Sequence, residues 1–174
     1  MDQVAIVEAS SPNDLAAIAT IDTGFTATEM LAVETRKGGF ALTIKAVDRT
    51  VWKAFPLDDV EQQWHVALVA RVGSSTVGFA SGNHHRWNRR LVISHFYVDR
   101  KHRRKGVGTA LMNAMVARGR QLGADHLWIE TSNLNVPAVA AYQQWGFELC
   151  GLDTAFYRAT PARGEVAIFL SFSL

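Results

Sequence analysis

Residues 99–115, DRKHRRKGVGTALMNAM, place five Lys or Arg side chains ahead of two glycines, Gly106 and Gly108. The β-forming run before them, ISHFYV (93–98), and the apolar spacing after them predict a buried strand, a loop and a helix over 106–122. The first N–H groups of such a helix lack acceptors and lie at the positive end of its dipole. We therefore expect the loop to bind a phosphorylated ligand. Because glycine has no Cβ, Gly106 and Gly108 let a phosphate approach the main chain.

Two common phosphate-binding motifs do not fit this loop. A P-loop requires Lys followed by Ser or Thr after its second glycine, and no such pair follows Gly106 or Gly108. The dinucleotide fingerprint requires a small third residue, where this chain has Leu111, and it usually opens a run of βαβ units. The remaining pattern is R-x-x-G-x-G, from Arg103 to Gly108.

The length and composition are those of a globular domain of enzyme size. The chain has 174 residues, 48% of them hydrophobic, and 18 Lys+Arg against 16 Asp+Glu give a formal net charge of +2. We expect one domain over 1–174, and the near-balanced charge argues against a nucleic-acid partner. The start of the chain does not resemble a signal peptide and no apolar run reaches the roughly 18 residues of a membrane span, so we expect a cytoplasmic protein without a membrane partner. The single cysteine, Cys150, is expected to be an inert, semi-buried thiol.

The hydrophobic pattern predicts alternating strands and helices around the loop. A strand over 4–9 precedes a helix, and three strands form an antiparallel meander before the loop; we place them at 64–72, 76–85 and 90–98. The run DHLWIETSN (125–133) predicts a strand parallel to the one before the loop. A helix over NVPAVAAYQQW (135–145) and two closing strands, FELCGLDTAFYRA (147–159) and EVAIFLSFSL (165–174), follow. Residues 24–62 give no clear pattern, although 40–55 favours extended or hairpin structure and 56–63 a short helical turn.

A second motif follows the loop at a distance of about thirty residues. The segment NVPAVAAYQQWGF fits N-x-x-A-x-x-x-Y-x-x-x-G-F at every fixed position: Asn135, Ala138, Tyr142, Gly146 and Phe147. Together with R-x-x-G-x-G, it resembles the acyl-CoA-binding core of the GCN5-related N-acetyltransferase (GNAT) superfamily, over about 91–150. The resemblance implies a mixed α/β (α+β) fold with a central, mostly antiparallel sheet that is splayed at one parallel strand pair and flanked by helices.

Within the superfamily, the chain resembles the streptothricin acetyltransferase branch. The run IETSNLN (129–135) is similar to the L-E-T-x-N-x-N of that branch, and GLDTAFY (151–157) to its G-F-D-x-x-x-Y, with Leu152 in place of the aromatic residue. The resemblance implies acetyl transfer from acetyl-CoA to a primary amine, the β-lysine amine of streptothricin, and hence antibiotic resistance. A polyamine, a protein N-terminus or lysine as acceptor, and a non-catalytic acyl-CoA-binding module or basic RNA-binding module, are the alternatives.

The resemblance also implies how acetyl-CoA is bound. The pantetheine arm would lie along the strand before the loop, hydrogen bonded to its main chain, and the pyrophosphate would lie on the loop amides from Arg104 to Thr109. Asn135 would bind the arm, and its side chain is also a candidate cap of the following helix; the two roles are compatible. The expected acetyl-CoA-binding residues are Phe96, Tyr97, Val98, Arg103, Arg104, Lys105, Gly106, Val107, Gly108, Thr109, Asn135, Ala138 and Tyr142.

Acetyl transfer requires a neutral amine, and an amine with a pKa near 10.4 is almost fully protonated at neutral pH, so a base is needed. The departing thiolate needs a group that stabilises or protonates it. The resemblance places Tyr142 as the acid that assists the thiolate. Glu130 ends the strand LWIE, where a carboxylate can accept the amine proton or attract the cation. His95 is an alternative base.

Other acidic residues are candidates for binding the cationic substrate. Asp153 is expected to bind it with Glu130, and Asp22 or Asp58 could add negative charge. His84, His85 and His102 lack the spacing and the acidic neighbours of a metal site, so we expect no metal. The protein is expected to be a monomer or homodimer, which no sequence feature decides.

Overall fold

The computed structural model describes residues 3–9, 12–57 and 63–174. The chain divides into two compact units, which are described separately. The first contains Met1–Phe25, Ala54–Trp128 and Ser173–Leu174, and the second contains Thr26–Lys53 and Ile129–Phe172. A single domain over 1–174 stays a prediction.

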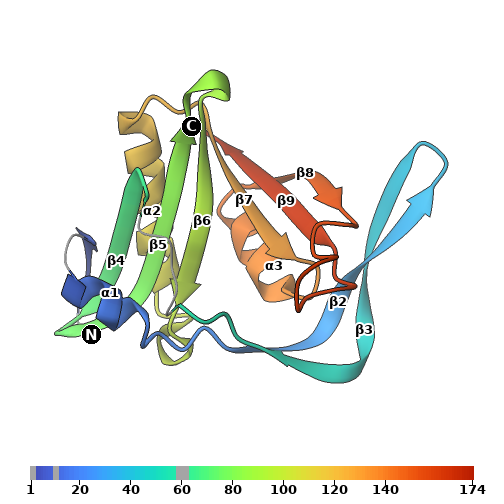
Figure 1. Ribbon diagram of the computed structural model, residues 1–174, viewed down its shortest axis with the longest axis horizontal. Coiled ribbons are helices and arrows are strands. Elements are labelled where there is room, and N and C mark those ends of the chain that lie inside the picture. Colours follow the sequence, from blue (N-terminus) through green and yellow to red (C-terminus); the bar gives the residue numbers. More distant parts are fainter. Residues whose placement is uncertain (1–2, 10–11, 58–62) are drawn as a thin grey trace. The chain divides into compact units, whose positions relative to one another are not determined.

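The sheet of the first unit contains the predicted meander. Strands β1 (Val4–Glu8), β4 (Val66–Val72), β5 (Ser75–His85) and β6 (Arg90–Val98) are neighbours in that order, and each pair is antiparallel (Figure 1). The register of β5 and β6 shifts by one residue, because Ser81 lies opposite His95 and Gly82 opposite Ile93. Ser94 is therefore the extra residue of a bulge in β6.

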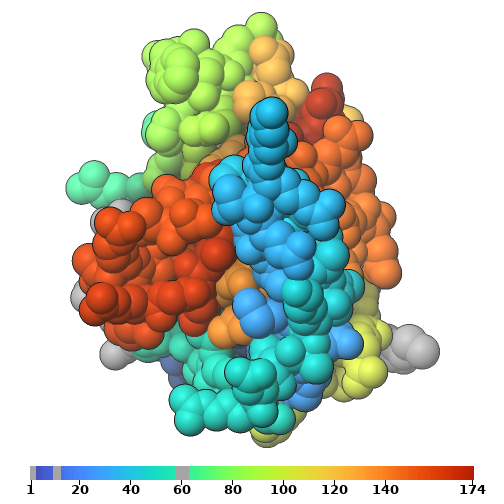
Figure 2. Space-filling view, turned by 90° about the vertical axis from the view of Figure 1, so that its right-hand side faces the viewer, coloured from blue at the N-terminus to red at the C-terminus, as the bar shows by residue number. Residues whose placement is uncertain are grey.

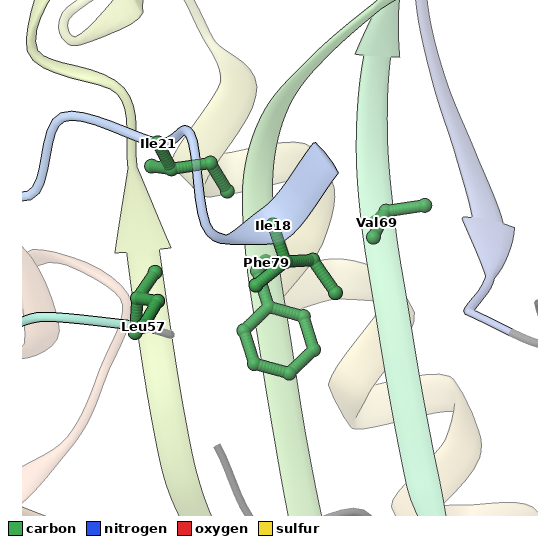
Figure 3. Packing of buried hydrophobic residues seen from close by; sticks show 5 residues of the cluster. All are labelled: Ile18, Ile21, Leu57, Val69 and Phe79. Carbon is green, nitrogen blue, oxygen red and sulfur yellow. The ribbon is translucent and has the colours of Figure 1, made fainter. Parts of the chain in front are cut away.

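Helices α1 (Pro12–Ile18) and α2 (Val107–Gln121) pack on this sheet. Ile18 of α1 lies against Phe79 of β5, in a cluster with Ile21, Leu57 and Val69 (Figure 3). Gly78, the neighbour of Phe79, faces the other side of the strand, where an added Cβ would lie 2.8 Å from Cδ1 of Leu111 in α2. The two helices therefore cover opposite faces of the sheet, and Gly78 allows α2 to approach closely.

The crossover after β6 is the predicted one. β6, α2 and β7 (His126–Ser132) follow one another, and β6 and β7 are neighbouring, parallel strands. β7 begins in the first unit and ends in the second. The mixed α/β fold with a mostly antiparallel sheet and one parallel pair is thus confirmed. Among the described residues, every helix is too short or too polar to cross a membrane.

In the second unit, β7 is followed in the sheet by β9 (Ala167–Ser173) and then β8 (Glu148–Asp153), which is antiparallel to β9. Helix α3 (Val136–Gln144) connects β7 to β8. The prediction of two closing strands is confirmed, but the first ends at Asp153, and turns occupy most of the chain from there to Gly164.

The second unit also contains a two-stranded ribbon, β2 (Phe25–Arg36) and β3 (Gly39–Lys53). It confirms the extended structure expected for 40–55, whereas most of the helical turn expected over 56–63 lies outside the described residues. Asn133, at the end of β7, is fully buried and links this ribbon to the start of β9. Its side chain donates to the carbonyl of Leu31 at 3.0 Å and accepts from the N–H of Val166 at 2.9 Å.

Candidate active site

The glycine loop of the first unit has a backbone shape suited to an anion. After the short helix η2 (Arg100–His102), Arg104 and Gly106 have positive φ angles of 60° and 84°, and α2 begins at the next residue. Gly106 adopts this left-handed conformation without steric cost, whereas Arg104 adopts it with strain. Successive N–H groups in such turns converge on a concave anion site, which the start of α2 extends.

Arg103 holds this loop through main-chain carbonyls. Its Nε donates to Val98 at 3.0 Å, its Nη1 to Gly24 at 2.9 Å, and its Nη2 to Thr23 at 2.9 Å and to Asp22 at 3.4 Å. A guanidinium has five N–H groups, so these bonds use most of them. These bonds favour a structural role for Arg103 in anchoring the loop to residues 22–24, and its contact with acetyl-CoA stays a prediction.

Asp99 and Asp22 fix the start of the loop. Asp99 accepts hydrogen bonds from the N–H groups of Lys101 at 3.0 Å and Asp22 at 3.1 Å, and contacts Nδ1 of His102 at 3.2 Å. Burial raises the pKa of Asp99, but these hydrogen bonds outweigh it and lower that pKa below its usual value. Asp22 forms an ion pair with Arg100 at 3.1 Å. The Asp22 carboxylate thus already has one cationic partner, and its role in binding a cationic substrate stays a prediction.

The other predicted residues of the first unit lie around the same loop. Arg104 and Lys105 are exposed, so these cations can reach a bound phosphate. The half-buried residues Phe96, Tyr97 and Val98 end β6, opposite Ala80, Phe79 and Gly78 of β5; the Val98 carbonyl is taken by Arg103. Val107, Gly108 and Thr109 form the first turn of α2.

His95, the alternative base, lies in an aromatic cluster of the first unit. Its ring centroid is 5.8 Å from that of Phe79, 6.1 Å from Tyr97 and 6.4 Å from Trp64. Its catalytic role stays a prediction, and these contacts favour a role in packing.

Glu130 lies in the second unit, half-buried on β7. The hydroxyl of Tyr157, from the turns after β8, donates a hydrogen bond to its Oε1. Burial raises the pKa of Glu130 above its usual value, and the charge of Glu165 acts in the same direction. The Tyr157 hydrogen bond and the charge of Lys53 lower it, but burial prevails. A carboxylate with a raised pKa is a better proton acceptor, as acid–base chemistry near neutral pH requires.

A second polar cluster lies beside Glu130. Lys53, the last residue of β3, forms an ion pair with Glu165, and both side chains are mostly buried, at 15% and 14% exposed. Ser132 donates its hydroxyl to the same carboxylate. Tyr157, Lys53, Glu165 and Ser132 were not predicted from the sequence, although Tyr157 lies in the segment GLDTAFY already noted there.

The remaining predicted residues of the second unit lie on or after α3. Tyr142 is buried, 6% exposed, and its ring packs against Trp145 and Phe147 with centroids 5.9 and 5.8 Å away. Asn135 precedes the helix and is half-buried, as is Ala138 in the first turn. Within the part of the chain that the structure describes, the Asn135 side chain makes no capping hydrogen bond, so the alternative of a side-chain cap is wrong.

Asp153 and Cys150 differ from expectation. The Asp153 carboxylate accepts the N–H of Ala155 at 2.7 Å and so shapes its own turn. Its strand is separated from that of Glu130 by β9, and substrate binding by Asp153 stays a prediction. Cys150 is exposed rather than semi-buried. Asp58 lies outside the described residues, and among residues 3–9, 12–57 and 63–174 no cluster of side chains could hold a metal ion.

The chain resembles known acetyltransferases over most of its length. Residues 39–147 match the family described as the acetyltransferase (GNAT) family. A streptothricin acetyltransferase from Streptomyces lavendulae is 37% identical over 172 residues, which cover 92% of this chain and 90% of that protein.

Solved structures give the same result. The crystal structure of nourseothricin acetyltransferase is 37% identical, with a TM-score of 0.89 and 98% of both chains covered. A structure described as a putative streptothricin acetyltransferase from Bacillus anthracis strain Ames, in complex with acetyl coenzyme A, is 25% identical, with a TM-score of 0.83 and 99% of this chain and 98% of that chain covered.

Proposed function

This chain belongs to the acetyltransferase (GNAT) family and is an acetyl-CoA-dependent N-acetyltransferase, and we propose that its acceptor is the β-lysine amine of streptothricin. The observation that carries the proposal is the similarity, along nearly the whole chain, to the streptothricin acetyltransferase of Streptomyces lavendulae. Acetylation of that amine would remove a positive charge from the antibiotic and give resistance.

Acetyl-CoA fits the residues of the glycine loop. The positive φ angles of Arg104 and Gly106 turn the main chain into a shape that accepts a pyrophosphate, and Arg104 and Lys105 supply exposed positive charge. We assign the pyrophosphate to the amides from Arg104 to Thr109. Arg103 positions the loop.

The pantetheine arm is assigned to two further groups of residues. Phe96, Tyr97 and Val98, at the end of β6, are proposed to bind it through their main chain as an added strand would, although the Val98 carbonyl already accepts a hydrogen bond from Arg103. Asn135 offers a side chain that no helix cap uses, and Ala138 follows in the first turn of α3.

Glu130 is the proposed proton acceptor. An ammonium group has no lone pair, so the amine must lose a proton before or during its attack on the thioester carbonyl. Glu130 is suited to this step because burial raises the pKa of its carboxyl and Tyr157 fixes one of its oxygens. Its negative charge also attracts the cationic substrate, with Asp153 as a second anion.

Tyr142 is the proposed acid for the thiolate. As the amine attacks, the carbon–sulfur bond breaks and the thiolate of CoA takes up a proton. A phenol can donate that proton or a hydrogen bond. The close packing of the Tyr142 ring against Trp145 and Phe147 supports the role, because it restricts the ring and hence the direction of the hydroxyl.

The proposal is tested with a panel of amines, acetyl-CoA and detection of the released thiol. The panel contains streptothricin, free lysine, a polyamine and a peptide with a free N-terminus. Streptothricin should have the highest kcat/KM, and expression of the protein should raise the streptothricin concentration that bacteria survive. A higher kcat/KM for the peptide or the polyamine would contradict the proposal. The cytoplasmic location and the monomeric or homodimeric state stay predictions.

A further inference from the structure

Two carboxylates of the second unit, those of Glu130 and Glu165, are brought to the same side of β7. Successive side chains of a strand point to opposite faces, so Glu130 and Ser132, two residues apart, share one face. Ser132 hydrogen bonds to Glu165, which precedes β9. Glu165 therefore lies beside Glu130, in agreement with the effect of its charge on the pKa of Glu130.

One ammonium group lies among these carboxylates. Lys53 pairs with Glu165, and its charge also acts on Glu130. Figure 2 shows the β2–β3 ribbon (blue to cyan), which ends at Lys53, beside the turn segment after β8 (orange-red) that leads to Glu165. Both partners of the pair are largely shielded from water, so their attraction is screened much less than that of a surface pair.

Lys53 has the same charged group as the proposed substrate. A lysine ammonium and a β-lysine ammonium are both primary alkylammonium ions, and either is attracted to a half-buried carboxylate. If Lys53 formed an ion pair with Glu130, the Glu130 carboxylate would no longer be available to the ammonium group of the substrate. Its pairing with Glu165 directs it elsewhere, and the Ser132 hydroxyl fixes the Glu165 carboxylate in that position.

We propose that Glu165 is a positioning residue that holds the Lys53 ammonium away from Glu130, so that Glu130 stays available to the ammonium of the substrate. This inference rests on the proposed function of Glu130 in binding and deprotonating the amine. When Lys53, Glu130 and Glu165 are all ionised, these three residues together carry a net charge of one negative unit. That charge belongs to Glu130 and matches a single substrate ammonium.

The test compares Glu165→Gln with the double variant Lys53→Met, Glu165→Gln. Glutamine keeps the size of the side chain and an oxygen that accepts the Ser132 hydrogen bond, but it cannot balance the charge of Lys53. Lys53 should then compete with the substrate at Glu130, and the KM for the amine should rise about tenfold or more. The KM for acetyl-CoA should not change.

The double variant removes the competing cation as well. Its KM for the amine should return to within about threefold of the wild type, a non-additive effect that measures the coupling of the two residues. The matched control is the exposed pair Lys45–Glu34 on the same ribbon, with a distance of 2.7 Å. Glu34→Gln should leave both KM values unchanged.

The pH profile supplies a readout that a loss of packing would not move. Lys53→Met removes the cation that lowers the pKa of Glu130, while the negative charge of Glu165 and the hydrogen bond from Tyr157 remain. The pKa of Glu130 should therefore rise. In Glu165→Gln it should fall, because the cation remains and the second carboxylate is lost. The acidic limb of kcat/KM should therefore shift in opposite directions in the two single variants.

The proposal is overturned if the KM for the amine is as high in the double variant as in Glu165→Gln. It is also overturned if both single variants shift the acidic limb of kcat/KM in the same direction. Should Glu165→Gln not fold, Lys53→Met alone decides, because the proposal requires its KM for the amine to stay at or below that of the wild type. Wild-type turnover is measured first with streptothricin. If another amine of the panel is preferred, the proposed acceptor is wrong, whereas the variants measured with that amine still test the role of Glu165.

Discussion

The hydroxyl of Tyr157 donates a hydrogen bond to the carboxylate of Glu130, although the two residues are 27 positions apart in the chain. The bond fixes one oxygen of a half-buried carboxylate and lowers its pKa against the effect of burial. The turns after β8 thereby supply a group that adjusts the proposed base.

Replacing Tyr157 with Phe should raise the pKa of Glu130, because the hydrogen bond that lowers it is lost while burial remains. The acidic limb of the kcat/KM profile should move to higher pH, and the activity at a pH below the limb should fall. Steady-state kinetics across pH measure this shift. Phe40→Leu, a change at an exposed phenylalanine of β3, is the control and should keep the wild-type profile. An unmoved limb in Tyr157→Phe would show that Tyr157 does not act on the base.

Replacing Tyr142 with Phe should lower kcat roughly 10²-fold and leave the affinity for acetyl-CoA near that of the wild type. The ring packing against Trp145 and Phe147 is kept, so the change isolates the hydroxyl. Single-turnover kinetics together with calorimetric titration of acetyl-CoA separate chemistry from binding. A wild-type kcat would assign the hydroxyl to structure alone.

Arg103 and Arg104 should respond differently to the same substitution. Arg103→Met removes the hydrogen bonds to Val98, Gly24 and Thr23 and should lower the free energy of unfolding by about 2 to 3 kcal/mol. Arg104→Met, at an exposed side chain, should leave the thermal midpoint unchanged and weaken acetyl-CoA about threefold or more. Thermal unfolding and calorimetry on both variants check this. The assignment of roles fails if Arg103→Met keeps its stability and loses only affinity.

Replacing Gly108 with Val should weaken acetyl-CoA binding by about 1.4 kcal/mol or more, a tenfold effect, because a branched side chain in the first turn of α2 would obstruct the pyrophosphate. Gly39→Val is the matched control, since an added Cβ there has no described neighbour within 4 Å. Unchanged calorimetric affinity in a folded Gly108→Val protein would exclude the loop as the pyrophosphate site.

Much of the fold follows from local patterns in the sequence. The runs of β-forming residues in β4, β5 and β6, broken by polar turn residues, and the glycines that bound α2 are signals carried by neighbouring residues. The β2–β3 ribbon was harder to predict, because large apolar side chains such as Phe40, Ile44 and Trp52 are exposed there and no clear buried face appears in the sequence.

The site was predictable only where a motif spans it and gives a residue its role. Gly106, Asn135 and Tyr142 belong to such patterns, whereas Lys53 and Glu165 lie outside every pattern, and Tyr157, although it ends the GLDTAFY segment, received no role from it. Their contacts with each other and with Glu130 are formed by tertiary structure. Arg103 shows a related limit: its place in the motif is visible in the sequence, whereas the hydrogen bonds of its guanidinium to the main chain of Val98 and Gly24 are visible only in the structure.

Glu130→Gln should make the protein more stable as well as less active. Because the folded pKa of Glu130 lies above its unfolded value, the folded state binds more protons between the two, and the free energy of unfolding falls as the pH rises through that window. Glutamine does not ionise, so Glu130→Gln avoids this fall in the free energy of unfolding. Its thermal midpoint at neutral pH should therefore be higher than that of the wild type. A lower midpoint at neutral pH would show that the carboxylate is needed for the fold.

The most direct test of the central claim follows the acetylation of streptothricin by the wild type and by Glu130→Gln, by mass spectrometry with fragmentation of the product. The wild type should add one acetyl group to the β-lysine amine. If Glu130 is the base, Glu130→Gln should lose kcat and the acidic limb of the pH profile; if it only attracts the amine, the KM should rise with kcat unchanged. An unmodified antibiotic after exposure to the wild type and acetyl-CoA, or an acetyl group on another position, would contradict the proposed acceptor. Wild-type constants in Glu130→Gln would contradict the proposed site.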